Sequence, residues 1–133
     1  MKRPLSALTA VSLSVALCLP AVASPALAQT QMTVAQFLEI GEDIPRNRAA
    51  AMLRSDTRQL IRVVTGAVNQ VKSEQSAAER AGRRPAHCIP SSGTGITPEN
   101  LVARFEGMPT SRRNVTVTQA VRDWMSERYP CRA

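Results

Sequence analysis

The residues with the most distinctive chemistry in this chain are two cysteines, Cys88 and Cys131. His87, the only histidine, precedes Cys88, so one hypothesis is a cysteine nucleophile activated by a neighbouring imidazole. Side chains adjacent on an extended segment usually point apart, however, and nucleophile–base pairs are normally brought together by the fold. Two cysteines in a protein bound for an oxidising compartment are typical of a structural bridge. We therefore predict a Cys88–Cys131 disulfide.

Other catalytic or metal-binding patterns are not evident in the sequence. One histidine and two widely spaced cysteines do not match the ligand spacing of a zinc site. The 10 acidic residues form no pair within apolar sequence that would raise a carboxyl pKa for acid–base work. The chain also lacks a nucleophile elbow and a phosphate-binding glycine loop. We expect a protein that is not an enzyme and that uses no metal and no cofactor.

The N-terminus has the pattern of a secretory signal peptide. Lys2 and Arg3 precede an apolar run from residue 5 to residue 19, and the triplet Ala26-Leu27-Ala28 suits cleavage after Ala28. Cys18 would be discarded with this peptide. The predicted organisation is a signal peptide at 1–28 and one small domain at 29–133 in the periplasm. No later apolar segment is long enough to span a bilayer, so we expect no membrane partner after cleavage.

The predicted mature domain is basic, with 15 of the 17 Lys and Arg residues and all 10 acidic ones, a formal charge of +5. The arginines are scattered, and aromatic residues that could stack on bases make up only 3% of the chain. We therefore expect no nucleic-acid partner. A solvated basic surface is the simplest interpretation, and an acidic protein or anionic wall polymer remains an alternative.

Helix-start signals divide the N-terminal half of the predicted domain. Thr33 with Gln36 forms a capping box before a first helix that would bury Phe37 and Leu38. A short helical turn is expected at 49–53. Asp56 with Gln59 forms a second box before a long amphipathic helix, which would run to about residue 81 and stop at Gly82. Its predicted apolar stripe consists of Leu60, Val64, Val68 and Val71, with Ile61 and Ala67 beside it.

Two further helices are predicted after a glycine-rich segment at 90–95, which should be an exposed and mobile loop. Thr97 with Pro98 at the first helical position marks one helix, which would bury Leu101, Val102 and Phe105 and end at Gly107. Thr116 with Gln119 marks the last helix, with an apolar side formed by Val117, Val121, Trp124 or Met125, and Tyr129. The predicted fold is a compact, all-α, single-domain bundle of four to five helices with one disulfide.

Several short segments in this order resemble the Rap/Tai immunity-protein family over most of the mature chain. They are Cys88-Ile89-Pro90, Leu101-Val102 with Phe105, Pro109 with Arg112-Arg113, residues 117–121, and Tyr129-Pro130-Cys131, with Phe37-Leu38 and Arg54-Ser55-Asp56 similar to the family's N-terminal half. The resemblance implies an exported periplasmic protein, often a homodimer. It also implies a partner: a peptidoglycan amidase, delivered by type VI secretion, whose active site the protein blocks.

For such an inhibitor we expect the loop at 91–95 to enter the partner's cleft, because a glycine-rich loop tethered at Cys88 can insert while its base stays rigid. The predicted partner-binding residues are Ser91, Ser92, Gly93, Thr94 and Gly95, flanked by Arg83, Arg84 and His87. A loop that merely tolerates change is the alternative. A periplasmic stress chaperone and a structural helical protein without a toxin partner are the alternative functions.

Overall fold

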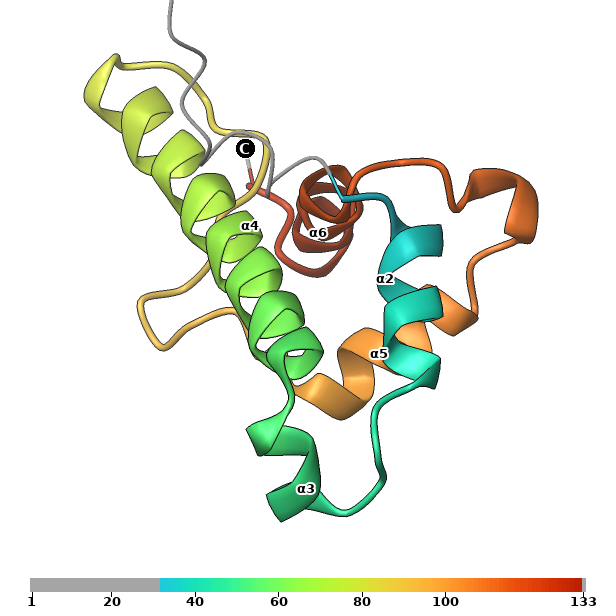
Figure 1. Cartoon of the computed structure of the whole chain (residues 1–133). Coiled ribbons are helices and arrows are strands. Elements are labelled where there is room, and N and C mark those ends of the chain that lie inside the picture. The colour runs from blue at the N-terminus through green and yellow to red at the C-terminus, as the bar shows by residue number, and fades with distance from the viewer. Residues whose placement is uncertain (1–31, 133) are drawn as a thin grey trace, which may run out of the picture.

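The computed structural model describes residues 32–132, so the predicted signal peptide and Cys18 lie outside the described residues. The fold is all-α, as predicted (Figure 1). Its elements in chain order are α2 (Val34–Glu42), α3 (Arg48–Leu53), α4 (Ser55–Arg80), α5 (Pro98–Glu106), the 3-10 turn η1 (Thr110–Arg112) and α6 (Val117–Arg128). Within 32–132 there is no strand, only an isolated antiparallel bridge between Thr33 and Thr116.

Threonine caps start three of these helices. Thr33 accepts a hydrogen bond from Gln36 N while the Gln36 side chain accepts one from Thr33 N, which completes the predicted capping box of α2. Thr97 caps α5, with Asn100 as the reciprocal partner and Pro98 at the first position. Thr116 caps α6 by accepting from Gln119 N. The helix starts were predictable because capping uses residues only three positions apart.

The starts of α2 and α6 are joined to each other. Val34 N donates to Val115 O at 3.0 Å, and Val117 N donates to Met32 O at 2.8 Å. The first N–H groups of a helix have no partner within it, so this exchange satisfies donors at both ends. It fixes the first residues of the described chain against the final helix.

The start of α4 corrects the prediction that Asp56 caps it. The helix begins at Ser55, Arg54 occupies the cap position, and no side chain bonds to the exposed amides there. Asp56 lies in the first turn, where it pairs with Arg54 at 2.9 Å. A carboxylate one position inside the start still interacts favourably with the helix dipole. The preceding α3 is capped by Asn47, a signal that the sequence interpretation missed.

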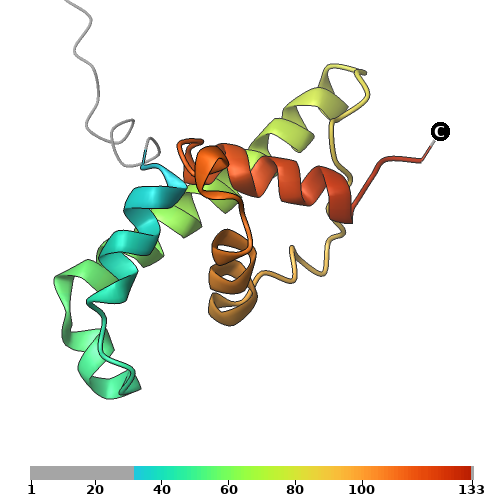
Figure 2. The ribbon, with the colours of Figure 1, turned by 90° about the vertical axis from the view of Figure 1, so that its right-hand side faces the viewer.

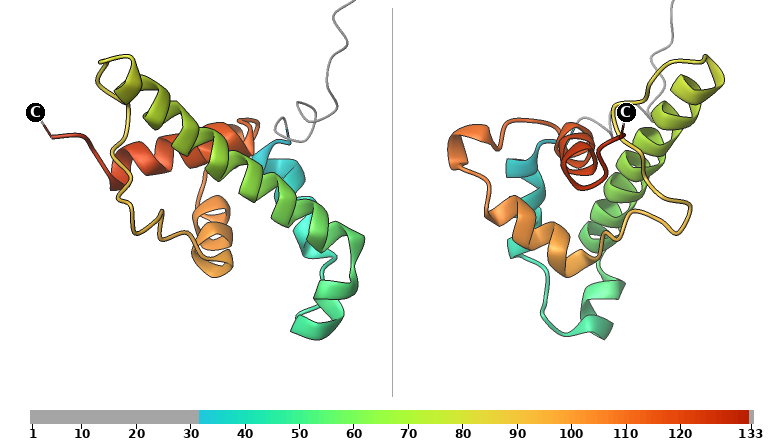
Figure 3. Two further views of the ribbon diagram at one scale, coloured as in Figure 1. Left: turned by 90° about the vertical axis from the view of Figure 1, so that its left-hand side faces the viewer. Right: turned by 180° about the vertical axis from the view of Figure 1, so that it is seen from behind.

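The buried face of α4 is rotated from the predicted stripe. Leu60, Val63, Ala67, Val71 and Ala78 are buried. The predicted neighbours Val64 and Val68 are half-buried, and Ile61 is 47% exposed. Both stripes have helical spacing, so the choice between them depends on which helix packs across α4. That helix is α6, which packs against α4 and crosses it at a wide angle (Figures 1 and 3).

The core lies where α2, α4, α5 and α6 meet. Phe37 of α2 and Phe105 of α5 pack edge to face, with ring centroids 5.3 Å apart. Trp124 and Met125 are both buried, so both of the alternatives for α6 face the core. Val102, predicted to be buried, is 38% exposed because Leu101 and Phe105 already fill the inner side of the short α5. At the end of α4, Gly82 adopts φ +66° and stops the helix as predicted.

Candidate functional site

Residues 87–90 run as a strap along α4 before the predicted binding loop. Gln75 of α4 holds Ile89 from both sides, because Gln75 Oε1 accepts from Ile89 N at 2.8 Å and Gln75 Nε2 donates to Ile89 O at 3.3 Å. Ile89 is buried with the core cluster. The base of the loop is therefore part of the folded domain.

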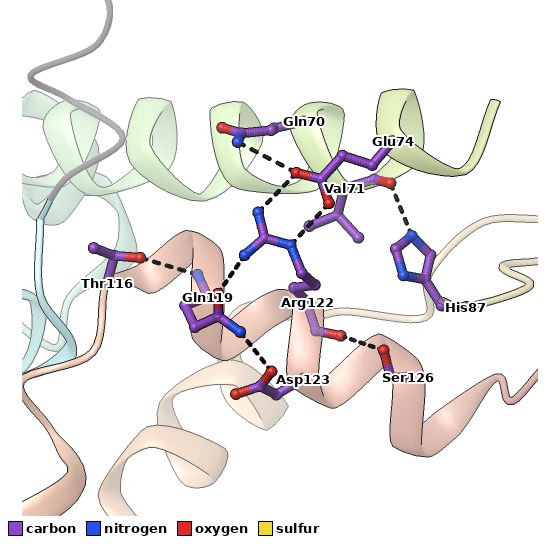
Figure 4. A network of polar contacts seen from close by, with 9 residues as sticks. All are labelled: Gln70, Val71, Glu74, His87, Thr116, Gln119, Arg122, Asp123 and Ser126. Atoms are coloured by element: carbon purple, nitrogen blue, oxygen red, sulfur yellow. Dashed lines mark hydrogen bonds and ion pairs between the residues drawn. The ribbon is translucent and has the colours of Figure 1, made fainter. Parts of the chain in front are cut away.

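His87 is also part of this strap, which corrects its prediction as an exposed partner contact. Its side chain is 1% exposed, and Nε2 lies 2.8 Å from Val71 O in α4 (Figure 4). Because a carbonyl only accepts hydrogen bonds, Nε2 must carry the proton and donate it. Among residues 32–132 the buried Nδ1 has no hydrogen-bond partner. His87 is a packing residue, and a partner could not reach it without unfolding the strap.

The predicted disulfide is present. Cys88 and Cys131 are bonded, with Cα atoms 5.0 Å apart. Cys88 N also donates to Tyr129 O at 2.8 Å, and the Arg84 guanidinium donates to Cys131 O. The bridge and these hydrogen bonds tie the strap to the residues that follow α6. Both Arg83 and Arg84 are exposed, and Arg84 is hydrogen-bonded within the molecule.

The loop at 91–95 is tethered more firmly than predicted. Tyr129 Oη donates to Thr94 O at 3.0 Å, and Asn100 Nδ2 donates to Gly95 O at 3.0 Å. Gly93 N donates to Pro90 O at 3.0 Å and closes a turn. These contacts order the C-terminal half of the loop, so the expectation of a mobile loop is wrong for Thr94 and Gly95.

The exposed tip of the loop is formed by Ser91 and Ser92. The loop projects from the helices beside α4 (Figures 1 and 3). Gly95 adopts φ +69°, and a Cβ there would lie 2.8 Å from Arg128 Nη2. The Arg128 guanidinium also lies over the Tyr129 ring at 5.6 Å. Glycine is favoured at this position because its φ lies in the left-handed region, and a Cβ would in addition displace the Arg128 guanidinium.

A second surface, which we call the α2–α5 groove, lies between α2, α4 and α5. It encloses about 550 Å³ and is lined mostly by apolar side chains. They include Leu38, Leu60, Ile61, Val64, Leu101 and Val102. Glu42, Glu106 and Arg113 supply charge among the lining residues. The sequence interpretation missed this groove because it expected Ile61 and Val102 to belong to a closed core.

A polar cluster joins α4 to α6 beside the strap (Figure 4). Arg122 binds Glu74 through two hydrogen bonds, from Nε at 2.8 Å and from Nη2 at 2.7 Å. Arg122 also donates to Gln119, whose amide donates to Asp123 at 2.7 Å. Such a two-point pair of guanidinium and carboxylate is both directional and strong. The cluster is suited to clamping two helices together.

The charges in this cluster favour a structural role for Glu74. Hydrogen bonding from Arg122, opposed by partial burial, lowers the pKa of the Glu74 carboxyl below its usual value. The same hydrogen bond raises the pKa of Arg122. A general acid needs the opposite shift, a raised carboxyl pKa. Glu74 therefore stays ionised and paired.

This shift predicts how the stability of the protein depends on pH. As the pH falls, a carboxyl whose pKa is lowered in the folded state is protonated first in the unfolded chain, at about pH 4.3. Its stabilisation is therefore present above that pH and is lost as the pH falls through the folded-state pKa. We expect Glu74→Gln to lower the free energy of unfolding by about 1 kcal/mol at neutral pH, since the pair is partly exposed.

The measurement is urea unfolding of both proteins at neutral pH and at about pH 3, below the usual carboxyl pKa. The difference in the free energy of unfolding between the unmodified protein and Glu74→Gln should shrink at the lower pH. Glu39→Gln, on the exposed side of α2, is the matched control and should leave the free energy of unfolding unchanged at both pH values. A difference that persists unchanged at low pH would show that the clamp does not depend on the ionised carboxylate.

Comparisons with known proteins do not assign this chain to a family. A scan against protein-family models finds no match, and searches for similar curated proteins and for similar solved structures also find none. The resemblance to the Rap/Tai family therefore stays a prediction. No helix within residues 32–132 is both long and apolar enough to cross a membrane. In the same residues, no group of three or more His, Cys, Asp or Glu side chains is placed to hold a metal ion.

Proposed function

We propose that this chain is a periplasmic immunity-type protein that binds and inhibits a secreted peptidoglycan amidase. One observation supports an inhibitory role most directly: an exposed loop is held in a single shape by its disulfide-anchored base. Ser91 and Ser92 project, while Thr94 and Gly95 are fixed by Tyr129 and Asn100. The Rap/Tai resemblance supplies the class of enzyme, and this transfer is by analogy.

The physical advantage of such a loop lies in the entropy of binding. A flexible loop must lose its freedom when it enters a cleft, and each immobilised side chain weakens binding by about 0.5–1.5 kcal/mol. Here the turn at Gly93 and the bonds to Thr94 and Gly95 form before any partner is met. Short serine side chains at the tip can enter a narrow cleft and offer hydroxyl groups for hydrogen bonds. A homodimer is also implied by the resemblance.

A bulky charge at the tip should weaken inhibition strongly while leaving the fold intact. Ser92 is exposed, so Ser92→Arg is expected to weaken inhibition of the cognate amidase at least about tenfold, through a steric and electrostatic clash in the cleft. Ser73→Arg, at an exposed position on α4, is the matched control and should inhibit like the unmodified protein. The readout is the inhibition constant from a peptidoglycan-hydrolysis assay. Equal inhibition by both variants would exclude the tip from the interface.

A stress chaperone is the second candidate function, and the α2–α5 groove favours it. An open apolar groove with exposed Ile61 and Val102 is a surface on which an unfolded segment could bind. Chaperones of the acid-activated kind should suppress aggregation of an unfolded client more strongly as the pH falls. We expect Ile61→Glu to remove that suppression if this function holds, whereas amidase inhibition through the loop should survive the same change.

A further inference from the structure

The short helix α3 exposes the side chains that a helix normally buries. It has 6 residues, and within the described part of the chain none of them is buried. Met52 is 53% exposed and Leu53 is 80% exposed. A helix this short is not stable in water by itself, so its cap at Asn47 and its packing on α4 must maintain it. The exposure of Met52 and Leu53 leaves apolar surface in water, and contact with another apolar surface would remove it.

The segment that carries these two side chains is rich in arginine. The stretch at 43–62 contains five arginines and two aspartates, and all five arginines are exposed: Arg46, Arg48, Arg54, Arg58 and Arg62. Arg58 Nη1 donates to Leu53 O at 3.3 Å, which places one guanidinium directly beside the most exposed apolar residue. Asp56 is paired with Arg54. The α3 tip, defined here as Met52 and Leu53 with these five arginines, combines two exposed apolar side chains with an excess of positive charge.

The α3 tip lies apart from the loop at 91–95. Helix α3 forms one end of the molecule, before the first turn of α4, and the loop lies on the other side of α5 from α3 in the same view (Figure 2). The two surfaces can therefore be occupied at the same time. The α3 tip is independent of the proposed inhibitory role.

We propose that the α3 tip is a membrane-contact surface that rests on the headgroups of an anionic bilayer. Met52 and Leu53 would enter the boundary between headgroups and acyl chains, while the arginines bind lipid phosphates. The apolar area of two side chains is far smaller than the roughly 800 Å² per partner of a stable protein interface. Membrane binding by so small an apolar area depends on the added attraction between the arginines and anionic lipids. This departs from the sequence-based expectation of no membrane partner, which considered only spanning segments.

The test places an environment-sensitive fluorophore at the tip of the full chain. With Cys18→Ser, and with Cys88 and Cys131 bonded to each other, Leu53→Cys provides one free thiol for labelling. Val102→Cys, also partly exposed but on α5, is the matched control. The vesicles contain equal parts of phosphatidylglycerol and phosphatidylcholine, and pure phosphatidylcholine vesicles provide the neutral comparison. Because the readout is local, contacts made by other parts of the chain do not contribute to it.

We expect a blue shift of the fluorophore at position 53 with anionic vesicles, none with neutral vesicles, and none at position 102 with either. The shift should disappear at about 1 M salt, where charges are screened beyond about 3 Å. Arg48→Gln should weaken binding about fivefold, and Met52→Ser should weaken it several-fold. Arg80→Gln, at the far end of α4, should have little effect because it lies outside the tip.

Three results would overturn the proposal. One is the lack of any shift at position 53 with anionic vesicles, and another is an equal shift with neutral vesicles. The third is an equal shift at position 102, which would mean that the bilayer contacts the α2–α5 groove. If the fluorophore at position 53 responds to soluble polyglutamate and not to vesicles, the surface instead recognises an acidic protein.

Discussion

Replacing Cys88 and Cys131 together by serine is expected to lower the free energy of unfolding by about 4 kcal/mol. The bond closes a loop across a sequence separation of 43 residues, and its main effect is to restrict the unfolded chain. Cys88 is exposed and Cys131 half-buried, so serine introduces little burial penalty at either position. For one small domain this loss is a large part of the whole stability.

The disulfide effect is measured by urea unfolding, with and without a reducing agent. The reductant should destabilise the unmodified protein by a similar amount and leave the double-serine variant unchanged. Loss of the bond should also weaken inhibition, because Tyr129 precedes Cys131 by only two positions and holds Thr94 in the loop. If the double-serine variant unfolds within about 1 kcal/mol of the unmodified protein, the bond does not maintain this fold.

Phe105→Ala is the second change with a large expected effect. Phe105 is fully buried and packs edge to face on Phe37. Removing the ring leaves a cavity between α2 and α5, and such changes destabilise proteins by about 3–5 kcal/mol. Helix α5 has only 9 residues and buries just Leu101 besides Phe105 within the described fold, so it has little else to hold it.

The matched control for Phe105 is on the same helix. Val102 is 38% exposed, so Val102→Ala should lower the free energy of unfolding by less than about 1 kcal/mol. Both variants are compared by thermal and urea unfolding. Similar losses for the two would mean that α5 does not pack through Phe105 as the structure shows.

The helix starts show what local sequence can predict. Thr33, Thr97 and Thr116 were identified as caps because each binds an amide three residues later. Asp56 failed as a cap because α4 begins earlier, directly after α3, and the break between the two helices at Arg54 has no local signature of its own. Cap chemistry thus predicts where a helix can start, and neighbouring elements decide among the possible starts.

Burial was predicted less well because it depends on partners distant in the sequence. His87 is polar and follows a proline, which suggests exposure, yet Val71 in α4 provides its acceptor and the strap buries it. The composition of the loop indicated mobility, but Tyr129, 35 residues from Thr94, fixes it. Likewise, the sequence indicates that α4 has an apolar side, but which of its residues are buried depends on how α6 packs against it.

The surfaces proposed for binding also differ in how far the sequence predicts them. The disulfide and the exposed tip of the loop were predicted, since compartment and glycine content are visible in the sequence. The α2–α5 groove was not, because each of its helices alone has an ordinary apolar face. Nor was the α3 tip, since Met52 and Leu53 in a short helical turn suggest core residues until their exposure is known.

Whether this protein inhibits a peptidoglycan amidase can be measured with the purified enzymes. Each amidase encoded in the same genome is assayed on purified peptidoglycan with increasing amounts of this protein. The proposed function predicts that one of them is inhibited at a near-stoichiometric ratio, that Ser92→Arg relieves this inhibition, and that Ser73→Arg does not. If every one of these amidases stays fully active at a large excess of the folded, disulfide-bonded protein, the proposed function is contradicted.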